Sequence, residues 1–247
     1  MDEVQVVVAH SERVTLRVGD VFLKVDSDPA RLDAEAEAMA AAPIPTAPIR
    51  WRKPSVIALG ALPGRALGRL GEPSPASPAA LAAAGAAVRT LHDAPLPARP
   101  GRGVDAHVRA ELESECELLV ATGMLPAGLV ARNRTVAEAA FRPYSPAFTH
   151  GDLQITHVFT DGDRVTGVLD WSEAGRGDPM FDLATLTLGH EERLADVLAG
   201  YGPGADPAVI RAWWSLRSLL NVRWLAGHGF DPFAPGGEVD VLKSRME

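Results

Sequence analysis

The sequence predicts an α+β fold of two lobes, a small antiparallel sheet over residues 1–60 and a mainly helical part over residues 61–247. Short β-branched segments, some alternating apolar and polar residues, crowd into the first sixty positions, which is typical of strands. Longer alanine-rich and leucine-rich segments with helical spacing make up most of the rest. The change falls at a Pro/Gly-rich point near residues 60–64, where we expect the lobes to join.

The first lobe begins with three strands, expected at residues 4–8, 14–18 and 21–25. A tight turn at Gly19-Asp20 joins the last two, so an antiparallel meander is predicted. Alanines and glutamates then favour a helix over residues 30–42 that stops before a proline. A further strand over residues 55–59 completes this lobe.

The second lobe is expected to be built from helices, with one hairpin among them. Strand patterns return at residues 158–160 and 165–169, and the turn Asp161-Gly162-Asp163 joins them. The predicted helices are residues 78–92, 104–122, 136–141, 180–188, 191–201 and 207–228.

Composition excludes several classes of protein. A length of 247 residues with 47% hydrophobic content is enough for a sizeable core. The net charge of −8 argues against a nucleic-acid partner, whose binding surface should be basic. The single cysteine, Cys116, excludes an internal disulfide and a thiolate zinc cluster. No signal peptide or membrane span is expected, so we predict a cytoplasmic protein without a membrane partner.

The predicted hairpin brings together residues that can carry chemistry. His150 and Asp152 interrupt an apolar segment just before its first strand, and Asp170 ends its second strand. Since a hairpin places its two strands side by side, Asp152, His157 and Asp170 should converge. Phosphoryl transfer needs such a set, one carboxylate to accept the proton of a hydroxyl and another to hold Mg²⁺.

Three segments in this region resemble the aminoglycoside phosphotransferase family. They are HGDL (150–153), VLDW (168–171) and GDPMFDLA (177–184), in the order and at the spacing of that family. The resemblance extends over about residues 6–186 and implies a bilobal protein-kinase-like fold. It also implies Asp152 as catalytic base, with His150 in the catalytic loop, and Asp170 as the principal Mg²⁺ ligand.

The resemblance also assigns a nucleotide site to the first lobe. Lys24 looks like the strand lysine that holds the α- and β-phosphates, and Glu35 like its helical partner, with Glu37 in reserve. The loop between the first two strands holds no glycine that would let backbone N–H groups approach phosphates. We expect Ser11 and Arg13 to take over that role.

Two further positions depart from the family pattern. His157 stands where the family usually has asparagine, and an imidazole is a poorer ligand than an amide oxygen for Mg²⁺. Some macrolide-type relatives also have histidine there, so we retain His157 as a metal ligand. Gln154 replaces the second histidine of the family motif.

Other conspicuous residues receive structural interpretations. His150 is expected to brace the catalytic loop, Asp178 to cap the helix after it, and Asp182 to anchor a loop. The tryptophans at 213, 214 and 224 are expected in the core or lining a groove, while Glu173 or Asp231 could receive an aminated acceptor.

The sequence therefore predicts transfer of the γ-phosphate of ATP or GTP to a hydroxyl of a small molecule, an antibiotic being the expected acceptor. One alternative is a kinase for an ordinary metabolite such as an amino alcohol or a sugar. Another is a pseudokinase that only binds, favoured by His157 and the glycine-free loop but opposed by the joint presence of Lys24, Asp152 and Asp170.

Overall fold

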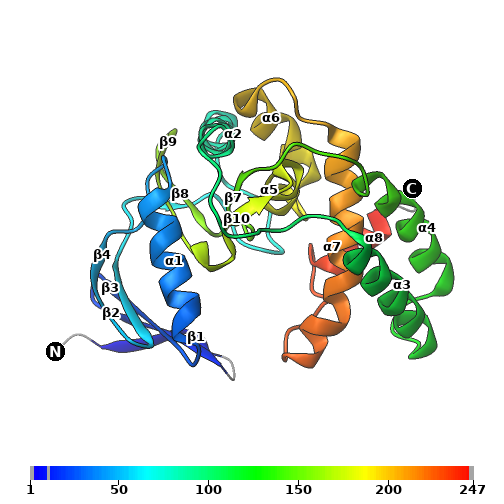
Figure 1. The fold of residues 1–247 in the computed structure, drawn as a ribbon, viewed down its shortest axis with the longest axis horizontal. Coiled ribbons are helices and arrows are strands. Elements are labelled where there is room, and N and C mark those ends of the chain that lie inside the picture. The colour runs from blue at the N-terminus through cyan, green and yellow to red at the C-terminus, as the bar shows by residue number, and fades with distance from the viewer. Residues whose placement is uncertain (1–2, 10–11, 245–247) are drawn as a thin grey trace.

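The structure is a computed structural model that describes residues 3–9 and 12–244. Its N-terminal part is a five-stranded antiparallel sheet in the order β1-β2-β3-β5-β4 (Figure 1). The strands are β1 (Val4–Ala9), β2 (Arg13–Val18), β3 (Val21–Asp26), β4 (Ile49–Lys53) and β5 (Val56–Gly60). The predicted meander of the first three strands is confirmed, with Thr15 opposite Lys24 and Leu16 opposite Leu23.

Helix α1 (Pro29–Ala41) lies against this sheet (Figure 1). Asp28 caps its N-terminus by accepting a hydrogen bond from the backbone N–H of Ala30, and Pro29 fits the first turn. Its buried residues include Leu32, Met39 and the carboxylic acid Glu35. A buried acid on an apolar helix face needs a partner, and strand β3 supplies one.

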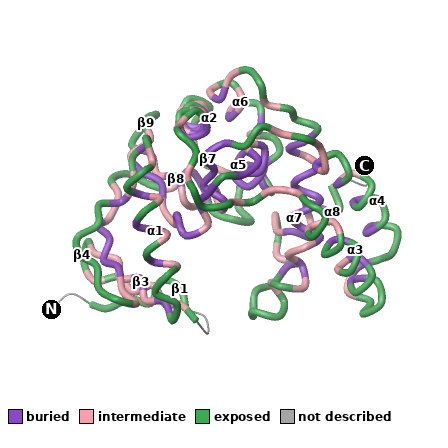
Figure 2. Tube along the Cα trace, in the orientation of Figure 1, coloured by how far each residue is buried: buried purple, intermediate pink, exposed green. Residues whose placement is uncertain are grey.

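The C-terminal part is mainly helical and holds the larger core (Figures 1 and 2). Its longest helix, α7, buries Trp213 and Trp214 and packs against α3, α4, α5 and α8. The helices are α2 (Pro78–His92), α3 (Ala106–Ala121), α4 (Ala127–Ala137), α5 (Pro179–Thr187), α6 (Leu194–Tyr201), α7 (Pro207–Gly227) and α8 (Glu238–Ser244).

Two small sheets in this part carry the loops of interest. Strands β6 (Arg65–Ala66), β8 (Val158–Asp161) and β9 (Arg164–Val168) form an antiparallel sheet in which β8 is central. Strand β7 (Ala147–Thr149) pairs with β10 (Gly175–Gly177) and leads directly to His150. The predicted hairpin is confirmed as β8–β9.

Several predicted elements need correction. The short helix expected over residues 136–141 is only the end of a longer one: α4 begins after Pro126 and continues into the 3₁₀ turn Glu138–Ala140. Strand β4 was not predicted, because it is short, fully exposed and rich in basic residues. The lobe boundary at residue 60 stays a prediction. None of the described helices combines the length and the apolar character needed to cross a membrane.

Candidate active site

The segment after β7 is held in one position by a buried carboxylate. Asp182, on α5, accepts hydrogen bonds from the backbone N–H groups of His150 (2.7 Å) and Gly151 (2.9 Å). Gly151 has a φ of +83°, and a Cβ atom there would overlap the carbonyl oxygen of Glu173. His92 donates to the same carboxylate (3.1 Å) and meets the hydroxyl of Tyr201 (3.0 Å). The loop that carries Asp152 is therefore fixed from α2, α5 and α6.

His150 joins this loop to the segment that carries Asp170. Its Nε2 lies 2.8 Å from the carbonyl oxygen of Leu169, which can only accept, so Nε2 bears the proton. Its Nδ1 then accepts from the backbone N–H of Asp152 at 3.3 Å. Burial lowers the pKa of His150, which favours the neutral ring. Both ring nitrogens are engaged, and this placement suits a brace rather than a proton carrier.

The Asp152 carboxylate is partly open to solvent, with 31% of its side chain exposed. The side-chain amide of Gln154 donates to both of its oxygens, at 3.0 and 3.2 Å. The Arg217 guanidinium approaches Oδ1 at 3.9 Å from α7. Asp152 is thus oriented from two sides and still accessible to a ligand.

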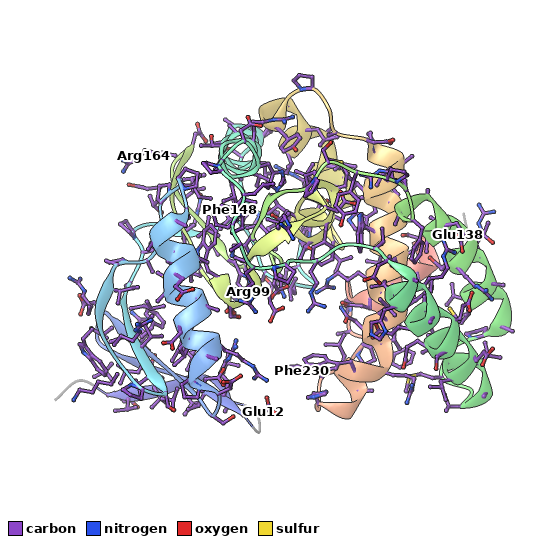
Figure 3. The ribbon with its side chains drawn as sticks, viewed as in Figure 1. Glu12, Arg99, Glu138, Phe148, Arg164 and Phe230 are labelled. Atoms are coloured by element: carbon purple, nitrogen blue, oxygen red, sulfur yellow. The ribbon has the colours of Figure 1, made fainter. Side chains whose placement is uncertain are left out.

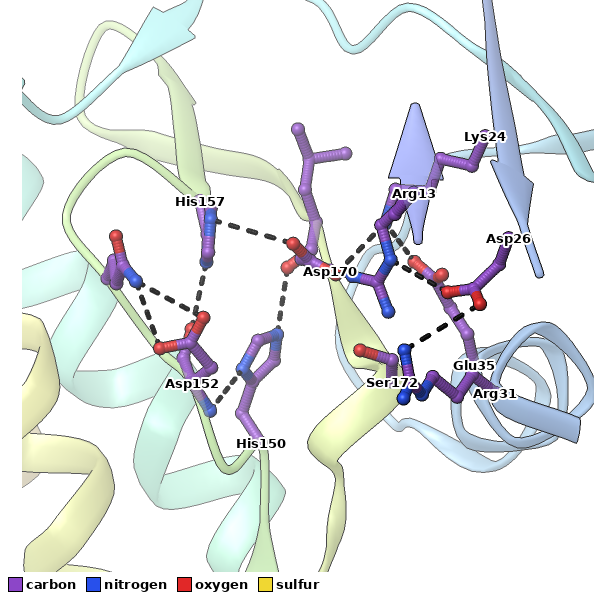
Figure 4. Close-up of polar contacts among 12 residues, drawn as sticks. Arg13, Lys24, Asp26, Arg31, Glu35, His150, Asp152, His157, Asp170 and Ser172 are labelled. Carbon is purple, nitrogen blue, oxygen red and sulfur yellow. Dashed lines mark hydrogen bonds and ion pairs between the residues drawn. The ribbon is translucent and has the colours of Figure 1, made fainter. Parts of the chain in front are cut away.

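His157 and Asp170 face each other beside Asp152 (Figure 4). His157 Nδ1 lies 2.8 Å from the backbone oxygen of Asp152 and must donate to it, and its Nε2 lies 4.0 Å from Asp170. One potential ligand atom from each of Asp152, His157 and Asp170 lies within 4.8 Å of the other two. Two carboxylates and an imidazole fit a divalent cation, and the carboxylates suit Mg²⁺ best.

Asp170 has a left-handed backbone, with φ of +66° and ψ of +62°. Aspartate enters this region more readily than most residues, and here the turn follows directly on β9. Burial alone would raise the pKa of Asp170, but the Lys24 ammonium, His157 and Arg13 outweigh burial and hold it well below its usual range. Asp170 is therefore an anion at neutral pH.

The N-terminal sheet contributes two cations to the same place (Figure 4). Lys24 Nζ lies 2.5 Å from Glu35 and 3.0 Å from Asp170. Although burial opposes it, these two carboxylates raise the pKa of Lys24. Arg13 donates to the buried Asp26 at 2.9 Å, and its Nη1 lies 3.7 Å from Asp170. Of the remaining predicted residues, Ser11 lies outside the described part of the chain.

The structure brings together residues that sequence patterns had left apart. Asp26, which holds Arg13, had no signal beyond its position at the end of β3. Arg217 lies far along the chain from Asp152 in a helix whose spacing indicates only core packing. Gln154 is the exception, because it stands out as a departure from the family motif directly after the HGDL segment, and it binds the Asp152 carboxylate.

Other residues that were expected to have structural roles lie partly in the core and partly at the surface. Asp178 caps α5 as predicted and also pairs with Arg142 (2.8 Å). Trp213 and Trp214 are buried, whereas Trp224 is 53% exposed. Trp224 stacks with Phe230, which lies on the side of the helical part that faces the N-terminal sheet (Figure 3). Glu173 pairs with Arg102 at 3.2 Å.

The fold is that of kinase-like phosphotransferases. Residues 10–213 match the sequence profile of the phosphotransferase enzyme family (APH), and the chain belongs to that family. Viomycin phosphotransferase from Streptomyces vinaceus is 33% identical over 100 residues, which cover 36% of this chain and 35% of that protein. The chain thus matches about a third of this relative's length.

Solved structures are similar over nearly the whole chain. An aminoglycoside phosphotransferase bound to GDP and kanamycin superposes with a TM-score of 0.72 at 16% identity, covering 99% of this chain and 93% of that one. A choline/ethanolamine kinase family protein from Mesorhizobium loti gives 0.68 at 21% identity, covering 99% and 88%. At these identities the likeness shows the fold, which confirms the predicted kinase-like architecture.

Proposed function

We propose that the chain transfers the γ-phosphate of ATP or GTP to a hydroxyl group of a small molecule. The observation that carries this proposal is the arrangement around Asp170, where Lys24 Nζ (3.0 Å) and His157 Nε2 (4.0 Å) approach the same carboxylate beside Asp152. A binding module without catalysis has no need for a lysine, a metal-binding carboxylate and a second, accessible carboxylate in one place.

Lys24 and Arg13 form the donor side of the proposed site. Lys24 contacts the α- and β-phosphates, and Glu35 keeps its ammonium directed toward them. Arg13, held by Asp26, lies where a glycine-rich loop would otherwise contribute backbone N–H groups, and its guanidinium suits phosphate oxygens. Asp170 and His157 would hold Mg²⁺, which would supply charge neutralisation at the phosphates.

Asp152 acts on the acceptor. Its carboxylate aligns the hydroxyl and accepts its proton as the oxygen attacks the γ-phosphorus, and the bond to the β–γ bridging oxygen breaks to release the nucleoside diphosphate. Gln154 fixes the orientation of the carboxylate while leaving part of it exposed. His150 and Asp182 keep the loop from moving, which matters because small misplacements are costly in catalysis.

We propose an antibiotic as the acceptor. Viomycin phosphotransferase and the kanamycin-bound aminoglycoside phosphotransferase support this assignment. The choline/ethanolamine kinase family protein supports the second candidate, a kinase for an amino alcohol or another ordinary metabolite. Both candidates use the same donor site and the same base.

A transfer assay tests the proposal. Wild-type protein is incubated with Mg²⁺, ATP or GTP, and a panel of viomycin, kanamycin, spectinomycin, a macrolide, a nucleoside antibiotic and choline. We expect transfer to at least one acceptor, lost by about 10²-fold or more in Asp152→Asn. Asp161→Asn, an exposed aspartate of the β8–β9 turn, serves as the control and should keep wild-type activity. Absence of transfer to every acceptor would refute the proposal.

A further inference from the structure

Arg217 is a cation that the donor side does not use. It lies on α7, and its Nη1 donates to Glu238, the first residue of α8, at 2.5 Å. The two side chains are largely buried, with exposed fractions of 15% and 10%. A buried arginine paired with a glutamate has a fixed direction, because rotating it away would leave both charges unpaired.

The other end of this guanidinium points to the catalytic base. Nη2 lies 3.9 Å from Asp152 Oδ1, which is too long for a hydrogen bond. Gln154 already donates to both oxygens of that carboxylate. Within residues 3–9 and 12–244, Nη2 has no hydrogen-bond acceptor. Its N–H groups are thus held next to the place where the acceptor hydroxyl must lie.

We propose that Arg217 is an acceptor-binding residue that donates a hydrogen bond to an oxygen of the acceptor next to the hydroxyl that is phosphorylated. This inference rests on the proposed function, since it needs Asp152 as the base. An oxygen bound there can meet Nη2 while the neighbouring hydroxyl meets Asp152. Glu238 holds the arginine in this position and balances its charge.

The proposal identifies a class of acceptor. A guanidinium donates hydrogen bonds to hydroxyl, ether, carbonyl or carboxylate oxygens, whereas an ammonium group offers it no acceptor. Sugar diols and hydroxylated peptides therefore fit the position beside Asp152. Amino alcohols such as choline do not, because the group next to their reacting hydroxyl is a cationic nitrogen, which cannot accept a hydrogen bond from Arg217. The arginine thus favours an oxygen-rich acceptor over the amino-alcohol alternative.

The test removes the charge pair as a unit. Replacing Arg217 alone would leave Glu238 unpaired and could unfold the protein, so the variant is Arg217→Met/Glu238→Gln. Its matched control is Arg223→Met/Glu115→Gln, another arginine–glutamate pair of α7 at 2.8 Å that involves α3. Arg217→Lys keeps the charge but loses the fork of donors. Melting temperatures and nucleotide affinity, measured by calorimetry with Mg²⁺, are recorded for all variants.

With the best acceptor of the panel, we expect the Arg217 pair variant to lose about 10- to 100-fold in kcat/KM, mainly through the KM for the acceptor. Its nucleotide affinity should remain within about twofold of wild type, and Arg217→Lys should recover part of the loss. Relative activity toward choline should rise. An unchanged KM for the acceptor, or an equal loss in the control pair, would overturn the inference. A wild type that phosphorylates no acceptor would instead overturn the proposed function, and this inference with it.

Discussion

Lys24 bridges two carboxylates that come from distant parts of the chain. Glu35 belongs to α1 and Asp170 to the turn after β9, and the lysine reaches both. The side chain of Glu35 is only 1% exposed. This arrangement gives the lysine a structural role as well as its proposed role toward phosphates.

Removing the lysine should therefore affect stability as well as activity. We expect Lys24→Met to lower the free energy of unfolding by about 3–5 kcal/mol, because a buried carboxylate is left unpaired. Lys24→Met/Glu35→Gln should regain much of that stability in urea unfolding, yet neither variant should transfer phosphate at the wild-type rate. Equal instability of the single and double variants would contradict the role of the unpaired Glu35.

His150 predicts a pH dependence of stability. Burial lowers its pKa in the folded protein below the ordinary value of 6.5, so the unfolded chain binds a proton first as the pH falls. The neutral ring of His150 therefore contributes to the free energy of unfolding above about pH 6.5. This contribution is lost as the pH falls further, at up to ~1.4 kcal/mol per pH unit. The pKa of Asp170 is also lowered from its ordinary value of 3.8, so its protonation reduces stability only below about pH 4.

Urea unfolding at several pH values between 5 and 8.5 checks this expectation. His150→Gln keeps a side-chain donor for the Leu169 carbonyl but cannot titrate, so its stability should fall less between pH 6.5 and 5 than that of wild type. Above pH 7.5 the two pH dependences should be parallel. Identical slopes below pH 6.5 would mean that His150 becomes protonated in the folded state.

At the scale of elements, helices α2 and α6 approach each other through glycine. A Cβ atom at Gly85 would overlap the backbone carbonyl of Val197 and lie 2.8 Å from the backbone nitrogen of Tyr201. This close packing positions His92 and Tyr201, which support Asp182 under the loop that carries Asp152. The distance between the two helices therefore matters for the active site.

Gly85→Ala should destabilise the protein even though alanine is the better helix former. The gain in helix propensity is at most about 1 kcal/mol, whereas pushing two packed helices apart costs typically ~1–3 kcal/mol or more. Gly128→Ala in α4 is the matched control, because its Cβ would meet no atom within 4 Å, and it should be neutral or slightly stabilising. The melting temperatures of both variants test this expectation. A Gly85→Ala protein as stable as the wild type would show that α6 can shift without a loss in free energy of unfolding.

Sequence patterns predicted the elements whose signal is local. The meander, α2 and the β8–β9 hairpin each carry alternation, capping residues or turn residues of their own. Strand β4 was not predicted because it is an edge strand that is exposed along its length and shows no alternation of apolar and polar burial. Its pairing with β5 stabilises it instead. The beginning of helix α4 was not predicted because its N-cap residue, Pro126, offers no side-chain hydrogen bond to mark the start of a helix.

The candidate site divides in the same way. Asp152, His157 and Asp170 are close because a hairpin connects them, so their convergence follows from the sequence. Arg13 lies near Asp170, and Arg217 near Asp152, only through the packing of distant elements. No periodicity or short motif encodes such contacts, which is why Asp26, Arg217 and Glu238 emerged from the structure alone.

For the molecule as a whole, Asp170 links the N-terminal sheet to the helical part through Lys24 and Arg13. In this state the carboxylate already has two cationic neighbours, at 3.0 and 3.7 Å. On the proposed function, Mg²⁺ would have to compete with them for this carboxylate. A triphosphate gives Lys24 and Arg13 other anions to bind and leaves Asp170 to the metal, so each ligand should strengthen the binding of the other.

We accordingly expect Mg²⁺ alone to raise the melting temperature little, and Mg²⁺ together with ATP or GTP to raise it more than the two separate shifts combined. A nucleotide concentration about 100 times the dissociation constant raises the free energy of unfolding by ~2.7 kcal/mol. For a chain of this size the melting temperature then rises by roughly 5–10 °C. A matrix of melting temperatures with metal, EDTA and nucleotide measures the coupling. Asp170→Asn should abolish it, because the metal loses its principal ligand while Lys24 still meets the phosphates. Strictly additive shifts of the melting temperature in the wild type would show that Asp170 does not exchange Lys24 for the metal ion when the nucleotide binds.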